Sequence, residues 1–590
     1  MMNAKPVNNA ILMICAAALC VGVSTGCDKS AETKYEEASN AVKSEVTFDG
    51  PSGSASPSRE EVAASPEPSV GLADEAEMEA PEEGVVNKMR MPRVKRGAKM
   101  MAGASGGRGV HNIVAPPPAQ KPTSAPADTG AKNAAVNPMT RVADDALSTF
   151  SIDVDTGAYT LARRAINSGA MPSPGTVRVE EFVNYFKYDY PAPKDGAFGV
   201  SLDAAPSPFE PALNRKIVRV GVQGKRLNRE SRKPVHLTFL VDVSGSMSGH
   251  DRIELAKESL QILTRNLGEE DTIAISTYSG AVKTILEPTG AAQRAKISKA
   301  IDSLSAGGGT RMGDGLELAY KMALKGFVAD HANRVIVLSD GDANVGATTF
   351  PEILSTIRSY VEDGVTLSTI GFGMGNYKDQ MMEQLANQGN GNYYYIDSKK
   401  EAQKVFGEQL DGTLQVIAKD VKIQVEFDAD SVISYRLLGY ENRDIADNDF
   451  RNDRVDAGEI GAGHSVTALY EVVLSEAAAR GKAISQLATV RIRAKTPTGT
   501  QAREQAFVLT TRDMHAKLAD ASQDFQFATA VAGFAEVLRD SPYAKGLSLA
   551  LVEELAKSAS TPAQADRQEF IGLVAKVKAS KSASAGVLLD

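Results

Sequence analysis

Three short segments of the sequence carry oxygen-bearing side chains of the kind that bind a hard divalent cation. In the first, Asp242, Ser244 and Ser246 alternate directly after an apolar run. The second is a glycine-rich stretch with one hydroxyl, Thr310, and the third is an apolar run followed by a carboxyl group, Asp340. Two carboxylates and three hydroxyls suit Mg²⁺, with Mn²⁺ as the alternative, and suit soft metals poorly. Because Mg²⁺ keeps several waters, such a site would leave one position open.

The apolar runs beside these side chains predict buried strands. Val235–Val243 and Arg334–Ser339 are rich in β-branched residues without polar alternation, as expected for strands covered on both faces. Helical patterns alternate with further strands as far as about residue 415. This alternation predicts an α/β fold with a doubly wound, mostly parallel sheet and right-handed crossovers. Ligands of such sheets bind beyond the carboxyl ends of the strands, where Asp242 and Asp340 fall.

The order D-x-S-x-S, then Thr, then Asp resembles the metal-ion-dependent adhesion site of von Willebrand factor type A domains, which have a Rossmann-like fold. All five positions match, in matching strand and loop contexts. The resemblance implies that the metal is bound by Asp242, Ser244, Ser246, Thr310 and Asp340. It also implies a protein-binding module that performs no covalent chemistry, in which an acidic side chain of an unknown partner protein completes the metal shell.

Two other uses of the same residues remain open. The metal would be structural if the protein were an envelope scaffold whose three loops it holds together. A metal-dependent hydrolase would need a general base near the bound water. Both carboxylates are already predicted ligands and no histidine lies among them, so the hydrolase is the weakest alternative. A serine nucleophile is disfavoured because no G-x-S-x-G motif surrounds Ser244 or Ser246.

The first 27 residues predict a secretory signal. Lys5 precedes an apolar run, Ala10–Val23, that is too short for an ordinary membrane-spanning helix. The next residues, Ser-Thr-Gly-Cys, resemble the lipobox of bacterial lipoproteins, although that family usually has Leu in place of Ser24. The resemblance implies that Cys27 is lipidated and that the protein is anchored to a membrane of the bacterial cell envelope, with its folded part in the periplasm. The choice between inner and outer membrane stays open, as does a plain cleaved signal or an uncleaved anchor.

Residues 28–143 predict a disordered linker between the anchor and the folded part. Ala, Pro, Ser and Glu are abundant there, and apolar periodicity is missing. A basic cluster at 88–99 is interpreted as a solvated charge block in preference to a lipid-binding surface. The net charge of −9 argues against a general nucleic-acid binder. All three cysteines precede residue 28, so the rest of the chain has no disulfide framework.

The remaining chain is interpreted as three parts: an N-terminal module at 144–230, the α/β domain at 231–415, and a C-terminal α+β module at 416–590. The first part carries Phe-Ser-Ile-Asp-Val-Asp-Thr and Arg-Val-Glu-Glu-Phe-Val-Asn-Tyr-Phe. These stretches resemble the N-terminal module of a subgroup of bacterial lipoproteins with a von Willebrand type A domain. The last part, with half-buried strands before helices, resembles the C-terminal module of that subgroup.

A second acidic motif lies in the N-terminal module. Asp153 and Asp155 match the start of the D-x-D-x-T motif of some phosphatases, but Gly157 stands where that motif requires Thr. The phosphatase interpretation is therefore disfavoured. No catalytic constellation is apparent in the C-terminal module, and its function and the oligomeric state of the chain stay open.

Overall fold

The structure is a computed structural model. It describes residues 136–210, 214–227, 232–342, 349–373, 379–480 and 485–587. The predicted signal, the predicted lipidation site Cys27 and nearly all of the predicted linker lie outside these residues. Among the helices that the structure describes, none is long and apolar enough to cross a bilayer.

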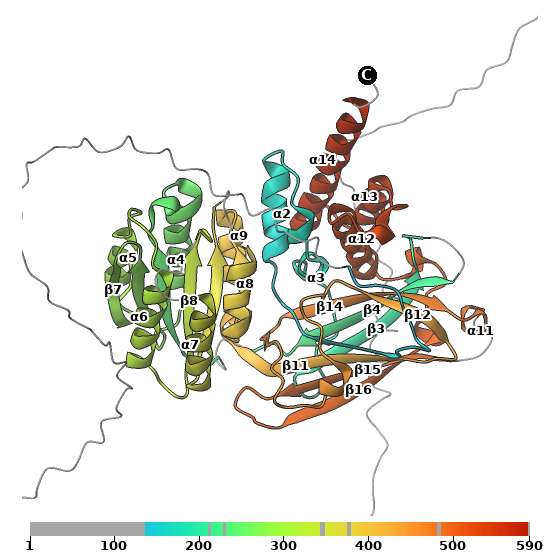
Figure 1. Cartoon of the computed structure of the whole chain (residues 1–590), viewed down its shortest axis with the longest axis horizontal. Coiled ribbons are helices and arrows are strands. Elements are labelled where there is room, and N and C mark those ends of the chain that lie inside the picture. The colour runs from blue at the N-terminus through green and yellow to red at the C-terminus, as the bar shows by residue number, and fades with distance from the viewer. Residues whose placement is uncertain are drawn as a thin grey trace, which may run out of the picture. The chain divides into compact units, whose positions relative to one another are not determined.

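The central domain is a six-stranded sheet with helices on both faces (Figure 1). The spatial order is β10-β9-β8-β5-β6-β7, and every neighbouring pair is parallel except β6 and β7. The strands are β5 (Val235–Asp242), β6 (Thr272–Tyr278), β7 (Val282–Gly290), β8 (Ala332–Ser339), β9 (Val365–Gly371) and β10 (Tyr393–Tyr395). This confirms the predicted doubly wound, mostly parallel sheet.

Two hydrophobic clusters cover the two faces of this sheet. Alternate residues of β5 divide between them: Leu237 and Phe239 join the cluster beneath α4, while Leu240 packs with α6. The helices are α4 (Leu255–Asn266), α5 (Arg294–Asp302), α6 (Met312–Lys325), α7 (Phe350–Glu362), α8 (Asp379–Gln388), α9 (Lys399–Gln403) and α10 (Leu410–Leu414). A π-helical turn at Lys404–Glu408 separates α9 from α10.

Strands from before and after the central domain pair with one another. β4 (Arg215–Gly224) lies between β3 (Phe198–Pro206) and β14 (Ser465–Leu474), antiparallel to both. β2 (Leu147–Ser151) is antiparallel to β11 (Val416–Phe427). The two flanking segments, which the sequence presents as separate modules, therefore share common sheets.

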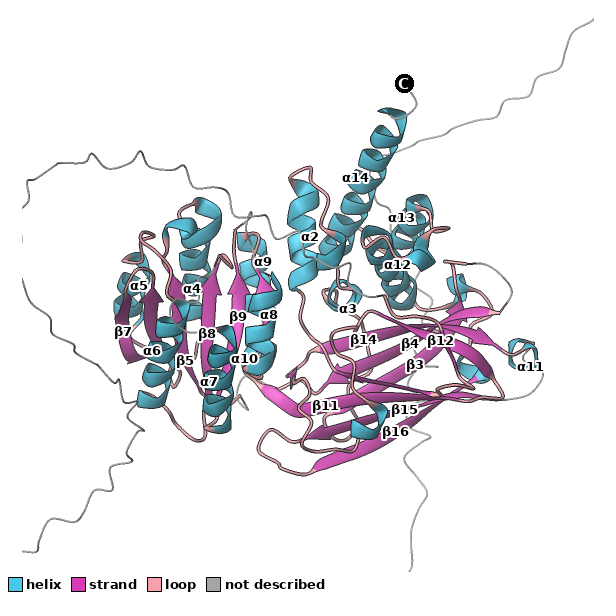
Figure 2. Ribbon diagram, viewed as in Figure 1, coloured by secondary structure: helices cyan, strands magenta, loops and turns pink. Residues whose placement is uncertain are grey.

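These shared sheets form a sandwich (Figure 2). One sheet has the order β1-β12-β14-β4-β3, and the other has the order β13-β11-β15-β16 with β2 also paired to β11. Residues of both sheets, among them Val220, Tyr470, Ile423 and Val490, form one hydrophobic core. The remaining strands are β1 (Thr140–Arg141), β12 (Val432–Leu438), β13 (Ile460–Gly461), β15 (Gln486–Lys495) and β16 (Ala502–Thr510).

A group of helices covers the outer face of the sheet that contains β4 and β14. Ile217 and Leu469 of that sheet share a hydrophobic cluster with Phe182, Phe534 and Phe570 of the helices. The helices are α2 (Gly157–Asn167), α3 (Val179–Asn184), α12 (Gln523–Leu538), α13 (Leu549–Ser558) and α14 (Ala565–Val587), and a short α11 (Glu476–Ala479) lies outside this group.

Helix α2 begins directly against the central domain. A Cβ atom at Gly157 would lie only 2.1 Å from the ring of Tyr393 on β10. Arg163 of the same helix binds Asp397 and Glu401 at the start of α9, at Nη2–O distances of 2.6 and 2.8 Å. Helix α2 therefore links the sandwich to the central domain.

Candidate metal site

The carboxyl ends of β5 and β8 carry the two predicted acidic ligands. The strands are parallel neighbours with Val241 opposite Leu338, so Asp242 and Asp340 lie at the same edge of the sheet. The strand order reverses here, since β6 lies on one side of β5 and β8 on the other. This is the switch point at which open α/β sheets bind ligands. Both carboxyl groups are buried, with exposed fractions of 0% and 6%.

The loop after β5 brings its two serines together. The Ser244 amide donates to Asp242 Oδ1 at 2.9 Å, which bends the chain back over the strand end. The hydroxyl oxygens of Ser244 and Ser246 lie 2.9 Å apart. Met247, which is fully buried, anchors the end of this loop in the hydrophobic core. The alternating spacing in the sequence thus places three oxygen-bearing side chains in one short loop.

The glycine-rich loop is bound to the serine loop through its main chain. The Gly307 amide donates to the Val243 carbonyl at 2.8 Å, and the Gly245 amide donates to the Gly308 carbonyl at 3.0 Å. Gly308 has a φ of +94°, a conformation that glycine adopts without strain. These contacts place the loop that carries the half-buried Thr310, two residues before α6, beside the serine loop. The serine loop and the glycine-rich loop therefore meet near the carboxyl end of β5, which is next to β8.

Two hydroxyl groups that the sequence did not point to hold the Asp242 carboxylate. The Tyr278 hydroxyl donates to Oδ2 at 3.0 Å, and the Ser339 hydroxyl donates to the same oxygen at 2.9 Å. Both residues end strands next to β5, so the pairing of the strands brings them there. The only signal in the sequence is that each is a polar residue at the end of an apolar run. Outer groups of this kind orient metal ligands and tune their affinity.

The site concentrates negative charge in a buried place. Burial raises the pKa of Asp242, and the nearby charge of Asp340 raises it further, while hydrogen bonds from Ser244 and Ser339 oppose this shift. Two buried carboxylates that repel each other are stabilised by a cation between them. The donor set contains oxygen alone and so fits Mg²⁺ or Mn²⁺. Within the described part of the chain, no group of three or more His, Cys, Asp or Glu side chains offers an alternative metal centre.

The turn after Asp340 behaves as an ordinary turn. The Asp342 amide donates to Asp340 Oδ1 at 3.2 Å, a contact that Asp side chains form with the main chain in turns. Asn344, a further polar residue after β8, lies outside the described residues.

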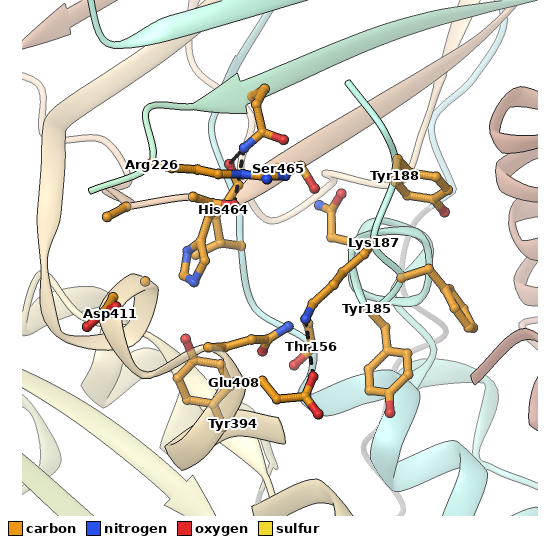
Figure 3. Close-up of a pocket in the computed structure, with 18 of the residues that line it drawn as sticks. Thr156, Tyr185, Lys187, Tyr188, Arg226, Tyr394, Glu408, Asp411, His464 and Ser465 are labelled. Carbon is orange, nitrogen blue, oxygen red and sulfur yellow. Dashed lines mark hydrogen bonds and ion pairs between the residues drawn. The ribbon is translucent and has the colours of Figure 1, made fainter. Parts of the chain in front are cut away.

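A separate cavity lies where the central domain joins the sandwich (Figure 3). It has a volume of about 450 Å³, and none of the five predicted metal ligands lines it. Lys187 extends across it to Glu408, with an Nζ–Oε2 distance of 3.3 Å. Burial lowers the pKa of His464 to about 4, so this lining histidine is neutral at pH 7. The cavity is therefore not part of the candidate metal site.

The second acidic motif is part of an ion pair inside the fold. Asp153 and Asp155 are buried, and Nη2 of Arg443 lies 3.0 Å from a carboxylate oxygen of each. Asp155 also accepts a hydrogen bond from the Tyr393 amide at 2.8 Å. These contacts connect the segment after β2 to the central domain, which gives the D-x-D motif a structural role.

The fold and the arrangement of its loops define a von Willebrand factor type A protein. The family model of that domain matches residues 236–408. A model described as von Willebrand factor matches residues 127–219, and a model of the C-terminal region of the uncharacterized protein YfbK matches residues 412–579.

The chain belongs to the family of YfbK, an uncharacterized protein of Escherichia coli. The two are 40% identical over 461 residues, which cover 74% of this chain and 79% of the Escherichia coli protein. The uncharacterized protein sll0103 of Synechocystis is 30% identical over 193 residues, or 33% of this chain and 45% of that protein. Human inter-alpha-trypsin inhibitor heavy chain H3 is 26% identical, and the match covers 41% of this chain and 29% of the human protein. The chain thus spans less than half the length of the last two relatives.

Among solved structures, the chain is similar to a von Willebrand factor type A protein from Catenulispora acidiphila. The two share 16% sequence identity, with a TM-score of 0.39. The match covers 63% of this chain and 88% of that protein.

Proposed function

We propose that this protein is a membrane-anchored, divalent-metal-dependent protein-binding module of the bacterial cell envelope, acting in adhesion or complex assembly. The observation that carries the proposal is the meeting of three segments, with Asp242, Ser244, Ser246, Thr310 and Asp340 at one edge of the central sheet. Membership of the von Willebrand type A class supports a binding role, since such domains typically bind proteins. The same class supports the absence of enzymatic activity.

The residues of the site have separate roles in this proposal. The two carboxylates and three hydroxyls would hold Mg²⁺ or Mn²⁺, and the bound ion would supply a positive charge with an open coordination position. Tyr278 and Ser339 fix the Asp242 carboxylate in one orientation. The partner would contribute an acidic side chain, since a carboxylate is the ligand that such an ion prefers.

The anchor is the second half of the proposal. Cys27 would carry the lipid, and residues 28–143 would let the folded part act at a distance from the membrane. Which membrane carries the anchor would be decided by fractionation of the envelope.

A structural role for the metal, in a scaffold protein, is the second candidate. Two of the three loops that the ion would join are already connected by main-chain hydrogen bonds, from Gly307 to Val243 and from Gly245 to Gly308. This direct connection favours a binding role, because the loops do not depend on the ion for their contact.

Replacement of Thr310 separates the two candidates. Thr310→Val removes one predicted ligand from a half-buried position and keeps the shape of the side chain, so we expect loss of metal-dependent capture of an envelope protein with a shift in Tm of less than about 2 °C. The measurement is a pull-down from envelope extract with Mg²⁺ or with EDTA, together with thermal unfolding. Ser305→Ala, at an exposed position in the same region, is the control and should behave as the wild type. Metal-independent capture, or strong destabilisation by Thr310→Val alone, would favour the scaffold.

A further inference from the structure

A positively charged side chain borders the candidate metal site. Arg252 lies on a π-helical turn, His250–Glu254, that follows the serine loop and leads into α4. Its Nη1 atom lies 3.9 Å from Asp340 Oδ2 and donates a hydrogen bond to the main-chain carbonyl of Ser246. One guanidinium group therefore contacts two of the three segments that form the site.

The surrounding chain fixes Arg252 in this position. Gly373, just beyond β9, has a φ of +75°, and a Cβ atom there would lie 2.4 Å from Arg252 Nε. The main chain at Gly373 thus packs against the guanidinium side chain, and the Tyr395 hydroxyl donates to the Gly373 carbonyl. About a quarter of the Arg252 side chain is exposed, so it also reaches the surface that a ligand would approach.

The adjacent acidic residue is engaged elsewhere. Asp251 pairs with Arg164, which lies on α2 of the flanking helices. The nearest acidic group of the site itself is Asp340. Asp251 is therefore paired with another cation, and Asp340 is the acidic group of the site that Arg252 approaches.

The formal charges of the site then lead to a coupling between its ligands. The carboxylates of Asp242 and Asp340 would attract a dication, while Arg252 places a positive charge beside the same position. A like charge close to a bound dication weakens its binding, and an anion that joins the site is attracted by both positive charges. Arginine is well suited to this task, since its planar group stays charged and binds carboxylates through two N–H donors.

We propose that Arg252 couples metal binding to the binding of the acidic ligand. It lowers the affinity of the site for the dication alone, and it strengthens the binding of a carboxylate that contacts both the ion and the guanidinium group. The proposal rests on the metal-dependent function proposed above. It makes Arg252 a specificity-determining residue for anionic ligands, although it is not itself a metal ligand.

The test is a measurement of Mn²⁺ affinity by titration calorimetry on the soluble chain from Asp28 onward. Each protein is measured in chloride and in acetate of equal ionic strength, with acetate as the smallest analogue of an acidic side chain. For the wild type we expect tighter Mn²⁺ binding in acetate than in chloride. For Arg252→Gln we expect Mn²⁺ binding in chloride to be about tenfold tighter than in the wild type, the order expected for removal of a nearby unit charge. In Arg252→Gln, the increase in Mn²⁺ affinity between chloride and acetate should be at least threefold smaller than in the wild type.

Two further variants separate charge from position. Lys257→Gln removes a cation from α4 that pairs with Glu254 and should leave both Mn²⁺ affinities within twofold of the wild type. Arg252→Lys keeps the charge and should keep the weak affinity for Mn²⁺ in chloride.

The outcomes are distinct. Suppose that Arg252→Gln has the circular dichroism spectrum of the wild type but binds Mn²⁺ no more tightly. The proposed coupling is then overturned, while the proposed metal site is unaffected. The same holds if Arg252→Lys behaves like Arg252→Gln, because the charge would then not be the cause. If the wild type itself binds no Mn²⁺, the metal-dependent function fails, and the coupling fails with it.

Discussion

At the scale of single residues, the candidate metal site depends on side chains that lie at strand ends. Asp242 is buried beneath its own loop and accepts hydrogen bonds from Tyr278 and Ser339 of the two neighbouring strands. These donors stabilise the ionised form of a carboxyl group whose burial favours the neutral form. A cation at this position would therefore meet a carboxyl group that is already oriented.

A buried histidine at the opposite end of the same strand gives a test of pH dependence. His236 is fully buried, its Nδ1 atom lies 2.5 Å from the Thr272 hydroxyl, and burial lowers its pKa to about 4. The unfolded chain binds this proton near pH 6.5 and the folded chain does not, so stability is complete above pH 6.5 and falls as the pH drops toward 4. Between pH 7.5 and pH 5 the loss from this residue is about 2 kcal/mol.

His236→Asn should remove this contribution. We expect the free energy of unfolding of the variant to fall by about 2 kcal/mol less than that of the wild type between the two pH values, as measured by urea titration with circular dichroism. Other groups, such as His464, titrate in both proteins and cancel in the comparison. His250→Asn, at an exposed position, should retain the full loss. An identical loss in His236→Asn and the wild type would contradict the assignment.

At this scale, the spacing of residues in the sequence pointed to the five predicted ligands but not to the groups around them. Asp242 and Ser244 belong to a local pattern with fixed spacing, which is readable without a structure. Arg252 follows the same loop, but its contact with Asp340 depends on the path of β9 and Gly373. Contacts between strand ends and turns are set by tertiary packing, and no spacing in the sequence encodes them.

At the scale of elements, α2 is held to the central domain by a buried ion pair. Arg163 is 3% exposed and binds Asp397 through Nε and Nη2, and it also binds Glu401. Arg163→Met would leave two largely buried carboxylates without their cation, at a cost of about 3–5 kcal/mol. Urea unfolding of the variant should show this loss, while Mn²⁺ affinity should stay unchanged because the metal site lies on other elements.

The matched control is an exposed pair of the same chemistry. Arg480 and Glu476 lie on one exposed face at and just beyond α11, with exposed fractions of 63% and 79%. Arg480→Met should cost less than about 0.5 kcal/mol, since solvent screens such pairs. Equal effects of the two substitutions would show that burial does not determine the strength of the Arg163 pair.

Strands β3, β7, β12 and β16 could not be predicted from the sequence, because none of them shows a clear alternation of apolar and polar residues. β7 is a partly exposed antiparallel edge strand, and β16 exposes four consecutive residues. β3 contains Gly, Asp and Pro, which are depleted in strands. β12 carries Arg436, whose charge is buried through ion pairs with Glu471 and Glu536. In each case, pairing with a neighbour overrides a weak local preference.

At the scale of the whole molecule, the central domain is an insertion within a discontinuous sandwich. The amide of Gly224, at the end of β4, donates to the His464 carbonyl, and Val416, at the start of β11, pairs with Gly461. The chain therefore leaves and rejoins the sandwich beside the same turn, 461–464. The sequence could show three parts in order, but it could not show that the first and last share sheets, because strand pairing between distant segments leaves no local pattern.

This arrangement predicts that the two halves of the fold respond differently to removal of the N-terminal part. In a chain that begins at Arg232, β14 loses its neighbour β4 and β11 loses its neighbour β2. The hydrophobic clusters of the central domain are made almost wholly by its own residues, so that domain should fold alone. In hydrogen exchange, we expect amides of β14 and β11 to exchange at least about 100-fold faster than in a chain beginning at residue 136, while amides of β5 and β8 stay protected.

Supplying residues 136–231 as a separate chain should restore protection in β14, since the lost partner strand would again be present. Full protection of β14 in the shortened chain alone would mean that the C-terminal segment folds independently, against the shared sheets described here.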